Sequence, residues 1–323
     1  DYSGTGEVKV TAKASGESFT VDFGDSTTAT QIVVADNVGD GNKVTVKGKG
    51  DVTLTSKEGD IDASGLTTGK LTADVTNTKD VTLTAAVANS DITAKGNTDT
   101  KTLTINAANN TGTVNLLNGG DVAGEVAVTN AKGTIDLAND YKGTGEVKVT
   151  TSTASVTVDF GDSTTATQIV DASSVADGNK LTLNGAGAVA LTSVNGDVDF
   201  GSATGKITAT VTHTEDATLT LNAVDTDIIS KGNTDTKTLT IDAAKNTSNK
   251  VTLKDGGSVA GEVSVINAIS TVEVADDYSG TGEVKVTAKA SGESFTVDFG
   301  DSTTATQIVV ADNVGDGNKV TVK

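Results

Sequence analysis

The chain has 323 residues, contains no Pro, Cys, Met or Trp, and is only 3% aromatic, which excludes a disulfide framework and disfavours a core of large rings. Its formal net charge is −19, from 43 acidic and 24 basic residues, and none of the basic residues is Arg. Phosphate binding needs clustered Lys or Arg, so we expect no nucleic-acid partner. No apolar run has the length of a membrane-spanning helix, so we expect no membrane insertion.

The chain is built from repeats. Residues 1–47 return letter for letter as residues 277–323, and in altered form from Asp140. Residues 1–139 and 140–276 share four landmarks in the same order, GTGEVKV, TVDFGDSTTATQIV, GNTDTKTLTI and VAGEV. We therefore predict repeat unit 1 at 1–139, repeat unit 2 at 140–276 and a partial unit 3 at 277–323. The third copy matches the first and not the second, as a larger period of 276 residues would produce.

Within the first repeat, short runs of alternating apolar and polar residues are separated by Gly, Asn and Asp. Such runs are typical of half-buried strands. We group them into five coils, at 7–42, 43–69, 70–100, 101–124 and 125–145. The prediction is an all-β protein, a parallel β-solenoid with tandem repeats of about 138 residues and roughly five coils in each.

The alternation also predicts which side chains face the core. In the second strand of each coil we expect the apolar pairs to point inward and a Thr beside each pair to point outward, so that the Thr residues form one column. The inward pairs are Val21/Phe23, Val52/Leu54, Val81/Leu83, Val114/Leu116 and Ile135/Leu137. The expected column is Thr20, Thr53, Thr82, Thr113 and Thr134.

A row of β-sandwich domains, one for each repeat, is the alternative fold, because it also consists of short alternating strands. The absence of Pro at the repeat junctions and the absence of Trp disfavour it. The junction DYxGTGEVKV, which continues as strand, favours the solenoid.

Four Asp residues are candidate Ca²⁺ ligands. Asp60 and Asp91 open the third strand of successive expected coils, and Asp197 and Asp227 take the same places in the second repeat. Stacked carboxylates about 5 Å apart repel unless a cation or a Lys lies between them, and Asp oxygens suit Ca²⁺. Solvated turn carboxylates are the alternative interpretation. No other cofactor is expected.

Nothing in the sequence indicates catalysis. His213 is the only His, and Asn77 stands in its place in the first repeat. The Gly-rich segments GTGEV and VGDGNK lack the GxxxxGK[ST] pattern and suit tight turns better than phosphate binding. Regular Thr arrays can bind ice, but Ala190 and Lys250 interrupt the corresponding column of the second repeat. We expect no enzymatic activity.

Runs such as KTLTINAANNTGTVNLLNGG and VTLTS, in a Cys-free acidic chain rich in Thr, Ala, Gly, Asp and Val, resemble those of bacterial surface-layer, biofilm-matrix and large secreted adhesin-like repeat proteins. This resemblance implies a secreted structural polymer at the cell surface, often strengthened by Ca²⁺.

We therefore expect an extracellular structural protein that self-associates into a filament, sheath or surface lattice by continued or end-to-end stacking of solenoid coils. Solenoids without polar caps leave strand edges open, and both ends here carry the same 47 residues. The alternative is the stalk of a secreted adhesin that binds a surface, a cell-surface glycan or Ca²⁺.

Overall fold

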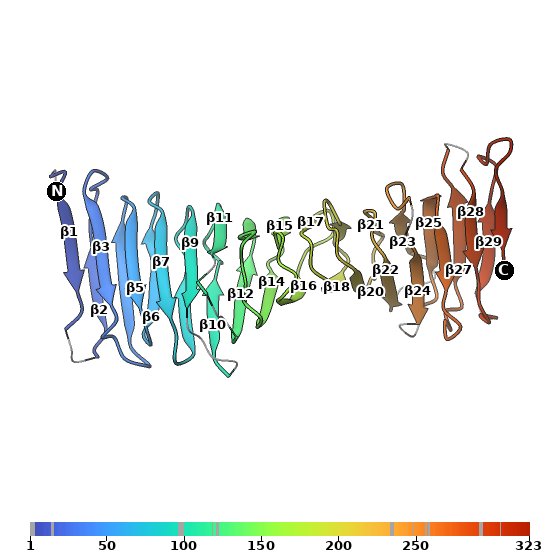
Figure 1. Ribbon diagram of the computed structural model, residues 1–323. Helices are drawn as coiled ribbons and strands as arrows, with labels where there is room; N and C mark the ends of the chain where they lie inside the picture. The colour runs from blue at the N-terminus through green and yellow to red at the C-terminus, as the bar shows by residue number, and fades with distance from the viewer. Residues whose placement is uncertain are drawn as a thin grey trace. The chain divides into compact units, whose positions relative to one another are not determined.

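The structure is a computed structural model, shown in Figure 1, and it contains strands and turns without any helix among the residues it describes. It describes the whole chain except residues 1–3, 14–15, 96–99, 118, 121–122, 233–235, 248, 256, 258, 291–292 and 304.

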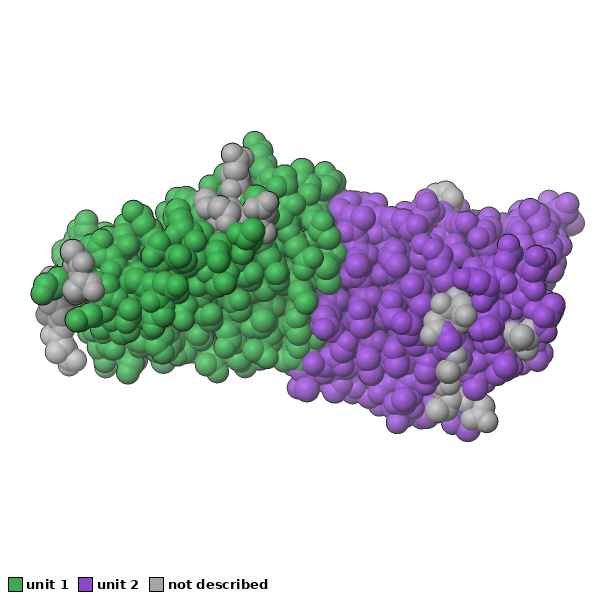
Figure 2. Space-filling view, turned by 90° about the horizontal axis from the view of Figure 1, so that it is seen from below, with its two compact units in different colours: residues 1–152, 156–169 green, residues 153–155, 170–323 purple. Residues whose placement is uncertain are grey.

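The chain forms two compact units. Unit 1 contains residues 1–152 and 156–169, and unit 2 contains residues 153–155 and 170–323 (Figure 2). Strand β16 (Thr167–Ala172) spans the division. In each unit, odd-numbered strands form one parallel sheet and even-numbered strands form another, which we name the odd sheet and the even sheet of that unit.

In unit 1, consecutive strands alternate between the two sheets. The odd sheet contains β1 (Glu7–Thr11), β3 (Thr30–Ala35), β5 (Val52–Ser56), β7 (Leu71–Thr76), β9 (Ser90–Lys95), β11 (Thr113–Leu117), β13 (Thr134–Leu137) and β15 (Val156–Asp159). The even sheet contains β2 (Phe19–Asp22), β4 (Lys43–Gly48), β6 (Asp60–Leu66), β8 (Val81–Thr84), β10 (Thr102–Asn106), β12 (Glu125–Ala131) and β14 (Glu146–Thr151).

Unit 2 follows the same plan. Its odd sheet contains β17 (Lys180–Asn184), β19 (Asp197–Asp199), β21 (Ala217–Thr220), β23 (Thr238–Asp242), β25 (Glu262–Ala268), β27 (Glu283–Ala288) and β29 (Thr306–Val310). Its even sheet contains β18 (Val189–Val194), β20 (Ile207–Thr212), β22 (Thr226–Lys231), β24 (Val251–Asp255), β26 (Thr271–Val274), β28 (Phe295–Asp298) and β30 (Val320–Val322).

The predicted parallel β-solenoid is confirmed. In β5, Val52 and Leu54 are buried while Thr53 between them is exposed, and this alternation recurs in most strands. The alternation gives each strand one apolar face, and the two sheets bury these faces against each other as a shared core. Each coil of the solenoid is thus one odd strand and one even strand with their two turns.

The β-sandwich alternative is wrong, because strands pair in parallel across the repeat boundaries. The boundary at residue 139 lies between β13 and β14, yet β12 pairs with β14. The boundary at residue 276 lies between β26 and β27, yet β26 pairs with β28 and β25 with β27. The repeats are therefore segments of a continuous coil within each unit.

The predicted grouping into five coils is wrong. The expected coil 7–42 contains β1, β2 and β3, but β1 pairs with β3, so two strands and not three complete a coil. The expected Thr column is split for the same reason. The five Thr residues do lie outside the core, but Thr20 and Thr82 belong to the even sheet, whereas Thr53, Thr113 and Thr134 belong to the odd sheet. The structure forms short Thr ladders instead, such as Thr113 beside Thr134.

A repeat contains an odd number of strands, so equivalent strands alternate between the sheets. Strand β14 repeats the EVKV sequence of β1 and comes thirteen strands later, in the opposite sheet of unit 1. Strand β4 has one equivalent strand in the second repeat, β17, and one in the partial third repeat, β30. Strands β17 and β30 both belong to unit 2 and again lie in opposite sheets. Two repeats contain twenty-six strands, which is an even number. A strand and its equivalent two repeats later are therefore both odd-numbered or both even-numbered.

Equivalent β-bulges adopt equivalent backbones in the two units. Asn130 in β12 and Asn267 in β25 both have positive φ, 57° and 59°. At each of them the pairing to the next strand shifts register, as in a β-bulge. Asn tolerates the left-handed region better than most side chains, so the repeated Asn fits the repeated bulge.

The single imidazole ring of the chain is buried in the core. His213 is fully buried, and neither ring nitrogen has a hydrogen-bond partner among the described residues. Asn77, its counterpart in unit 1, is also fully buried but donates a hydrogen bond to the Lys79 carbonyl over 3.2 Å. Burial lowers the pKa of His213 to about 4, against an opposing attraction from Asp216.

We expect this buried His213 to make the protein acid-sensitive. Because its pKa is lower in the folded than in the unfolded chain, protons bind the unfolded chain first as the pH falls below about 6.5. By pH 4 this lowers the free energy of unfolding by about 3 kcal/mol. His213→Asn removes this component, and Asn77→His introduces one in unit 1. Guanidinium denaturation at pH 7 and pH 4.5 measures both; a pH-independent difference between wild type and His213→Asn contradicts the prediction.

Candidate interaction surfaces and the outer charge ladder

The four candidate Ca²⁺ ligands do not stack as expected. Asp60 lies in the even sheet and Asp91 in the odd sheet of unit 1. In unit 2, Asp197 lies in the odd sheet and Asp227 in the even sheet. The expected stacking was wrong because it assumed three strands in a coil, and the two-strand coil places successive candidates on opposite sheets.

Each of these carboxylates binds groups of the protein itself. Asp60 accepts a hydrogen bond from the backbone N–H of Thr82 over 2.7 Å, and Asp197 accepts one from Thr218 over 2.8 Å. These matching bonds tie each Asp to the next coil of its sheet. Within the described part of the chain, no group of three or more His, Cys, Asp or Glu side chains is arranged to hold a metal ion.

The other two candidates are neutralised by Lys. Asp91 forms an ion pair with Lys70 and accepts a hydrogen bond from Asn115 over 2.7 Å. Asp227 lies between Lys206, at 2.9 Å, and Lys254, at 2.8 Å. Lys side chains thus occupy the positions where a bound cation was expected.

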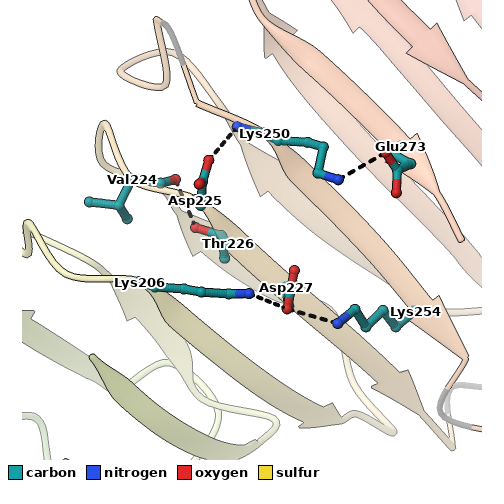
Figure 3. A network of polar contacts seen from close by, with 8 residues as sticks. All are labelled: Lys206, Val224, Asp225, Thr226, Asp227, Lys250, Lys254 and Glu273. Atoms are coloured by element: carbon teal, nitrogen blue, oxygen red, sulfur yellow. Dashed lines mark hydrogen bonds and ion pairs between the residues drawn. The ribbon is translucent and has the colours of Figure 1, made fainter.

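Asp227 belongs to a larger network on the outer face of the even sheet of unit 2 (Figure 3). We name this network the charge ladder; it consists of Lys206, Asp225, Asp227, Lys250, Lys254 and Glu273. Cationic and anionic side chains alternate from one strand to the next. Lys206 precedes β20, the two Asp lie at β22, the other two Lys at β24, and Glu273 in β26. Opposite charges on neighbouring strands stabilise a sheet, whereas like charges destabilise it.

The ladder's contacts link four successive coils. The backbone N–H of Lys250 donates to Asp225 over 2.9 Å, and its Nζ forms an ion pair with Glu273, also over 2.9 Å. The Asp227 side chain is only 11% exposed. Burial raises its pKa, but the hydrogen bonds from Lys254 and Lys206 outweigh burial and lower the pKa below its ordinary value. The same contact raises the pKa of Lys206.

The ladder surrounds a polar hollow of about 380 Å³. Its walls carry three Lys and three carboxylates, together with Thr252. Because the charges balance and pair with each other, the hollow favours neither anions nor cations. We interpret the ladder as a device that connects coils.

Unit 1 has the positions equivalent to the charge ladder, but most of the Lys residues are replaced there. Asn89, Thr113 and Leu117 replace Asp225, Lys250 and Lys254 of the ladder. Asp136 lies opposite Asp159, just as its counterpart Glu273 lies opposite Asp298. Glu273 is paired with Lys250, whereas no ion pair among the described residues includes Asp136 or Asp159. Burial, and then repulsion from Asp159, raise the pKa of Asp136. The carboxylates at these positions are thus paired with Lys in unit 2, whereas in unit 1 Asp136 and Asp159 repel each other without a Lys partner.

The first coil exposes residues that the same sequence buries elsewhere. Val8 and Val10 of β1 and Phe19 of β2 are partly exposed. Their counterparts in the third copy, Val284, Val286 and Phe295, are buried beneath β25 and β26. Beside the first coil lies a hollow of about 220 Å³, lined by Val8, Asp22, Phe23, Ser26, Ala29 and Gln31.

The coil formed by β29 and β30 also exposes residues that are buried in an equivalent coil. Val322 of β30 is 56% exposed, whereas its counterpart Val46 is 0% exposed because β6 pairs with β4. Val309 of β29 is partly exposed, whereas Val33 is fully buried against Leu54 of β5. The edge strands of these two coils are the candidate surfaces for self-association. None of the described residues belongs to a helix long and apolar enough to cross a membrane.

Sequence reasoning predicted open strand edges but missed the charge ladder. The signal was available in the alternation of Lys206, Asp227, Lys254 and Glu273 over successive coils. It could be recognised only with the two-strand coil, which shows which residues become neighbours.

The repulsion at Asp136 predicts opposite effects of two equivalent substitutions. The folded chain holds the pKa of Asp136 above its unfolded value, so this carboxylate opposes folding at pH 7 and ceases to do so below pH 4. Asp136→Asn should therefore raise the free energy of unfolding by about 0.5 kcal/mol at pH 7 and leave it unchanged at pH 3. Glu273→Gln, which loses Lys250, should lower it by a similar amount. Denaturation curves at both pH values test this; two changes of the same sign at pH 7 contradict it.

A second substitution tests the ladder. Asp227→Asn leaves Lys206 and Lys254 close together without a carboxylate, and should destabilise the protein by about 1–2 kcal/mol at neutral pH. Because the folded pKa of Asp227 is lowered, this stabilisation is present above the unfolded pKa and disappears as the pH falls through the folded value. Asp91→Asn in unit 1, which frees one Lys, is the matched control and should cost less. Equal losses in thermal unfolding would contradict the prediction.

Comparison with protein-family models, with curated proteins and with solved structures finds no match to this chain. The case for a function therefore depends on the geometry of the edge strands and of the outer face.

Proposed function

We propose that this protein is an extracellular structural protein that forms a filament, sheath or surface lattice by continued or end-to-end stacking of its solenoid coils. The observation that supports the proposal is that identical sequence is buried in one copy and exposed in the other. Val46 is fully buried where β6 packs against β4, and Val322 is 56% exposed where the structure describes no coil packed against β30.

Open edges of parallel strands favour association with another copy. They present unpaired backbone N–H and C=O groups, which the next strand of any added coil satisfies. The two edges here are different surfaces, β1 with β2 and β29 with β30. A contact between two different surfaces repeats without closing and produces an open polymer.

The outer face suits a structural role. Many of its charges are neutralised across coils, as in the charge ladder, and the ladder encloses no uncompensated charge that would select a ligand. The net charge of −19 favours solubility of the free chain before assembly. Secretion and a position at the cell surface form part of the proposal through the resemblance of the repeats to surface-layer and biofilm-matrix proteins.

Association should depend on the face of β30 that points into the core. Val322→Lys places a charge where the added coil would bury it, and should raise the concentration needed for assembly at least about tenfold. Thr321→Lys, on the outward face of the same strand, is the control and should assemble like the wild type. Negative-stain imaging and light scattering of the purified chain over a concentration series provide the measurement. A wild-type chain that stays monomeric at millimolar concentration contradicts the proposal, as does unchanged assembly of Val322→Lys.

A further inference from the structure

We infer that the protein contains a buried hydration site that recurs with the repeats, in which one water molecule joins a Ser hydroxyl to a Gln amide oxygen. The site lies in the turn FGDSTTATQIV, which leads into a strand of the solenoid. Unit 1 contains it twice. Ser26 and Gln31 form it before and within β3, and Ser163 and Gln168 form it before and within β16. The site belongs to the interior of the solenoid and does not depend on self-association.

In both turns one hydrogen bond holds the Gln side chain in place. Nε2 of Gln31 donates to the Ser26 carbonyl over 2.8 Å, and Nε2 of Gln168 donates to the Ser163 carbonyl over 2.7 Å. This bond uses an amide N–H and leaves Oε1, which can only accept, in need of a separate donor. The Ser hydroxyl takes no part in the bond and needs a partner as well.

Each turn buries two polar atoms that lack a partner. Ser26 and Gln31 are 8% and 1% exposed, and Ser163 and Gln168 are 3% and 1% exposed. Neither the Ser Oγ nor the Gln Oε1 of either turn has a hydrogen-bond partner among the described residues. Burying such atoms unpaired is unfavourable, and folded proteins almost always supply a partner from the protein or from ordered water. Because the same two atoms are left over in two repeats, we assign them one common partner.

The two atoms of a turn belong to residues that line one space. Ser26 and Gln31 both border the hollow of about 220 Å³ beside the first coil. Much of the remaining wall is apolar and comes from Val8, Phe23 and Ala29. A water molecule needs far less room than this hollow provides. The hydroxyl and the amide oxygen can therefore share a single bound molecule.

In the second copy of the turn the same residues are shut inside the solenoid. The counterparts of the apolar wall residues, Val147, Phe160 and Ala166, are all buried. Bulk solvent therefore does not reach Ser163 and Gln168 at this position, and a molecule bound there is held by the fold.

Water is the ligand whose hydrogen bonds match both atoms. Gln Oε1 accepts, whereas Ser Oγ can donate. One water molecule can donate to the first and accept from the second, so that it satisfies both at once. Two side-chain partners also meet the minimum that an ordered buried water requires.

The third copy of the turn satisfies its Ser without water. Ser302 Oγ donates to the Tyr278 carbonyl over 3.1 Å, and Gln307 is exposed. In the second copy the Ser163 hydroxyl makes no equivalent bond to the carbonyl of Tyr141, the counterpart of Tyr278. The same turn sequence thus uses a direct bond in one repeat and a bridging molecule in another.

Substitution of Ser by Ala tests the site through the sign of its effect. If a water molecule bonds to the Ser163 hydroxyl, Ser163→Ala removes a hydrogen bond and should lower the midpoint of thermal unfolding by about 1–3 °C. A hydroxyl buried without any partner gives the opposite sign, because Ala removes the cost of burying it. Ser302→Ala, which loses the direct bond to Tyr278, is the control and should lower the midpoint in either case.

A crystal structure at atomic resolution gives the second readout. The expected result is one water-sized density peak within about 2.5–3.0 Å of both Ser163 Oγ and Gln168 Oε1. An unchanged or raised midpoint for Ser163→Ala overturns the inference, as does the absence of this peak or a direct bond between the two side chains. Neither readout requires assembly, so a chain that stays monomeric contradicts the proposed function and leaves the hydration site standing.

Discussion

The structure depends on one constraint, the stacking of equivalent residues at the strand spacing of about 4.8 Å. A Val or Leu that points inward must meet another apolar side chain in the strands before and after it. Val33, Leu54 and Ala73 form such a stack across β3, β5 and β7. Nothing in a single coil can stabilise it alone, so stability grows through neighbours. The shared core and the open edges both follow from this dependence.

The same constraint decides how much of the fold could be predicted. Alternation within a strand reveals the strand and its inner face, and Val52, Leu54 and Thr53 lie as their pattern indicates. Alternation contains no information about which strand comes next in the sheet. The expected column of Thr20 and Thr53 failed for that reason, as did the stacking of Asp60 and Asp91. Repeats show that a chain is an array but not how many strands complete a coil, because strands of every coil look alike.

Stacking also means that the environment of a charged side chain is set by the residues on the adjacent strands. A carboxylate on the outer face meets the residue above and below it, whatever its surroundings in the sequence. Glu273 and its counterpart Asp136 each face an Asp on the following coil, but only Glu273 is also paired with a Lys, Lys250. The two repeats therefore place a carboxylate at the same position, once with a Lys partner and once without. The candidate sites could not be predicted from composition, since the partner of each Asp lies about twenty residues away in the chain, as Lys206 does from Asp227.

The odd number of strands in a repeat has a consequence for symmetry. Moving from β1 to β14 in unit 1 advances the sequence by one repeat and transfers it to the opposite sheet. This operation resembles a twofold screw axis, with each half-turn reproducing one motif on the other side. A solenoid with an even count would repeat its chemistry along a single side and leave the other side distinct. With an odd number of strands in a repeat, the outer faces of the two sheets carry similar outward residues, offset along the solenoid by one repeat. Any molecule that recognises an outward motif of one repeat therefore meets the equivalent motif of the next repeat on the opposite face of the unit.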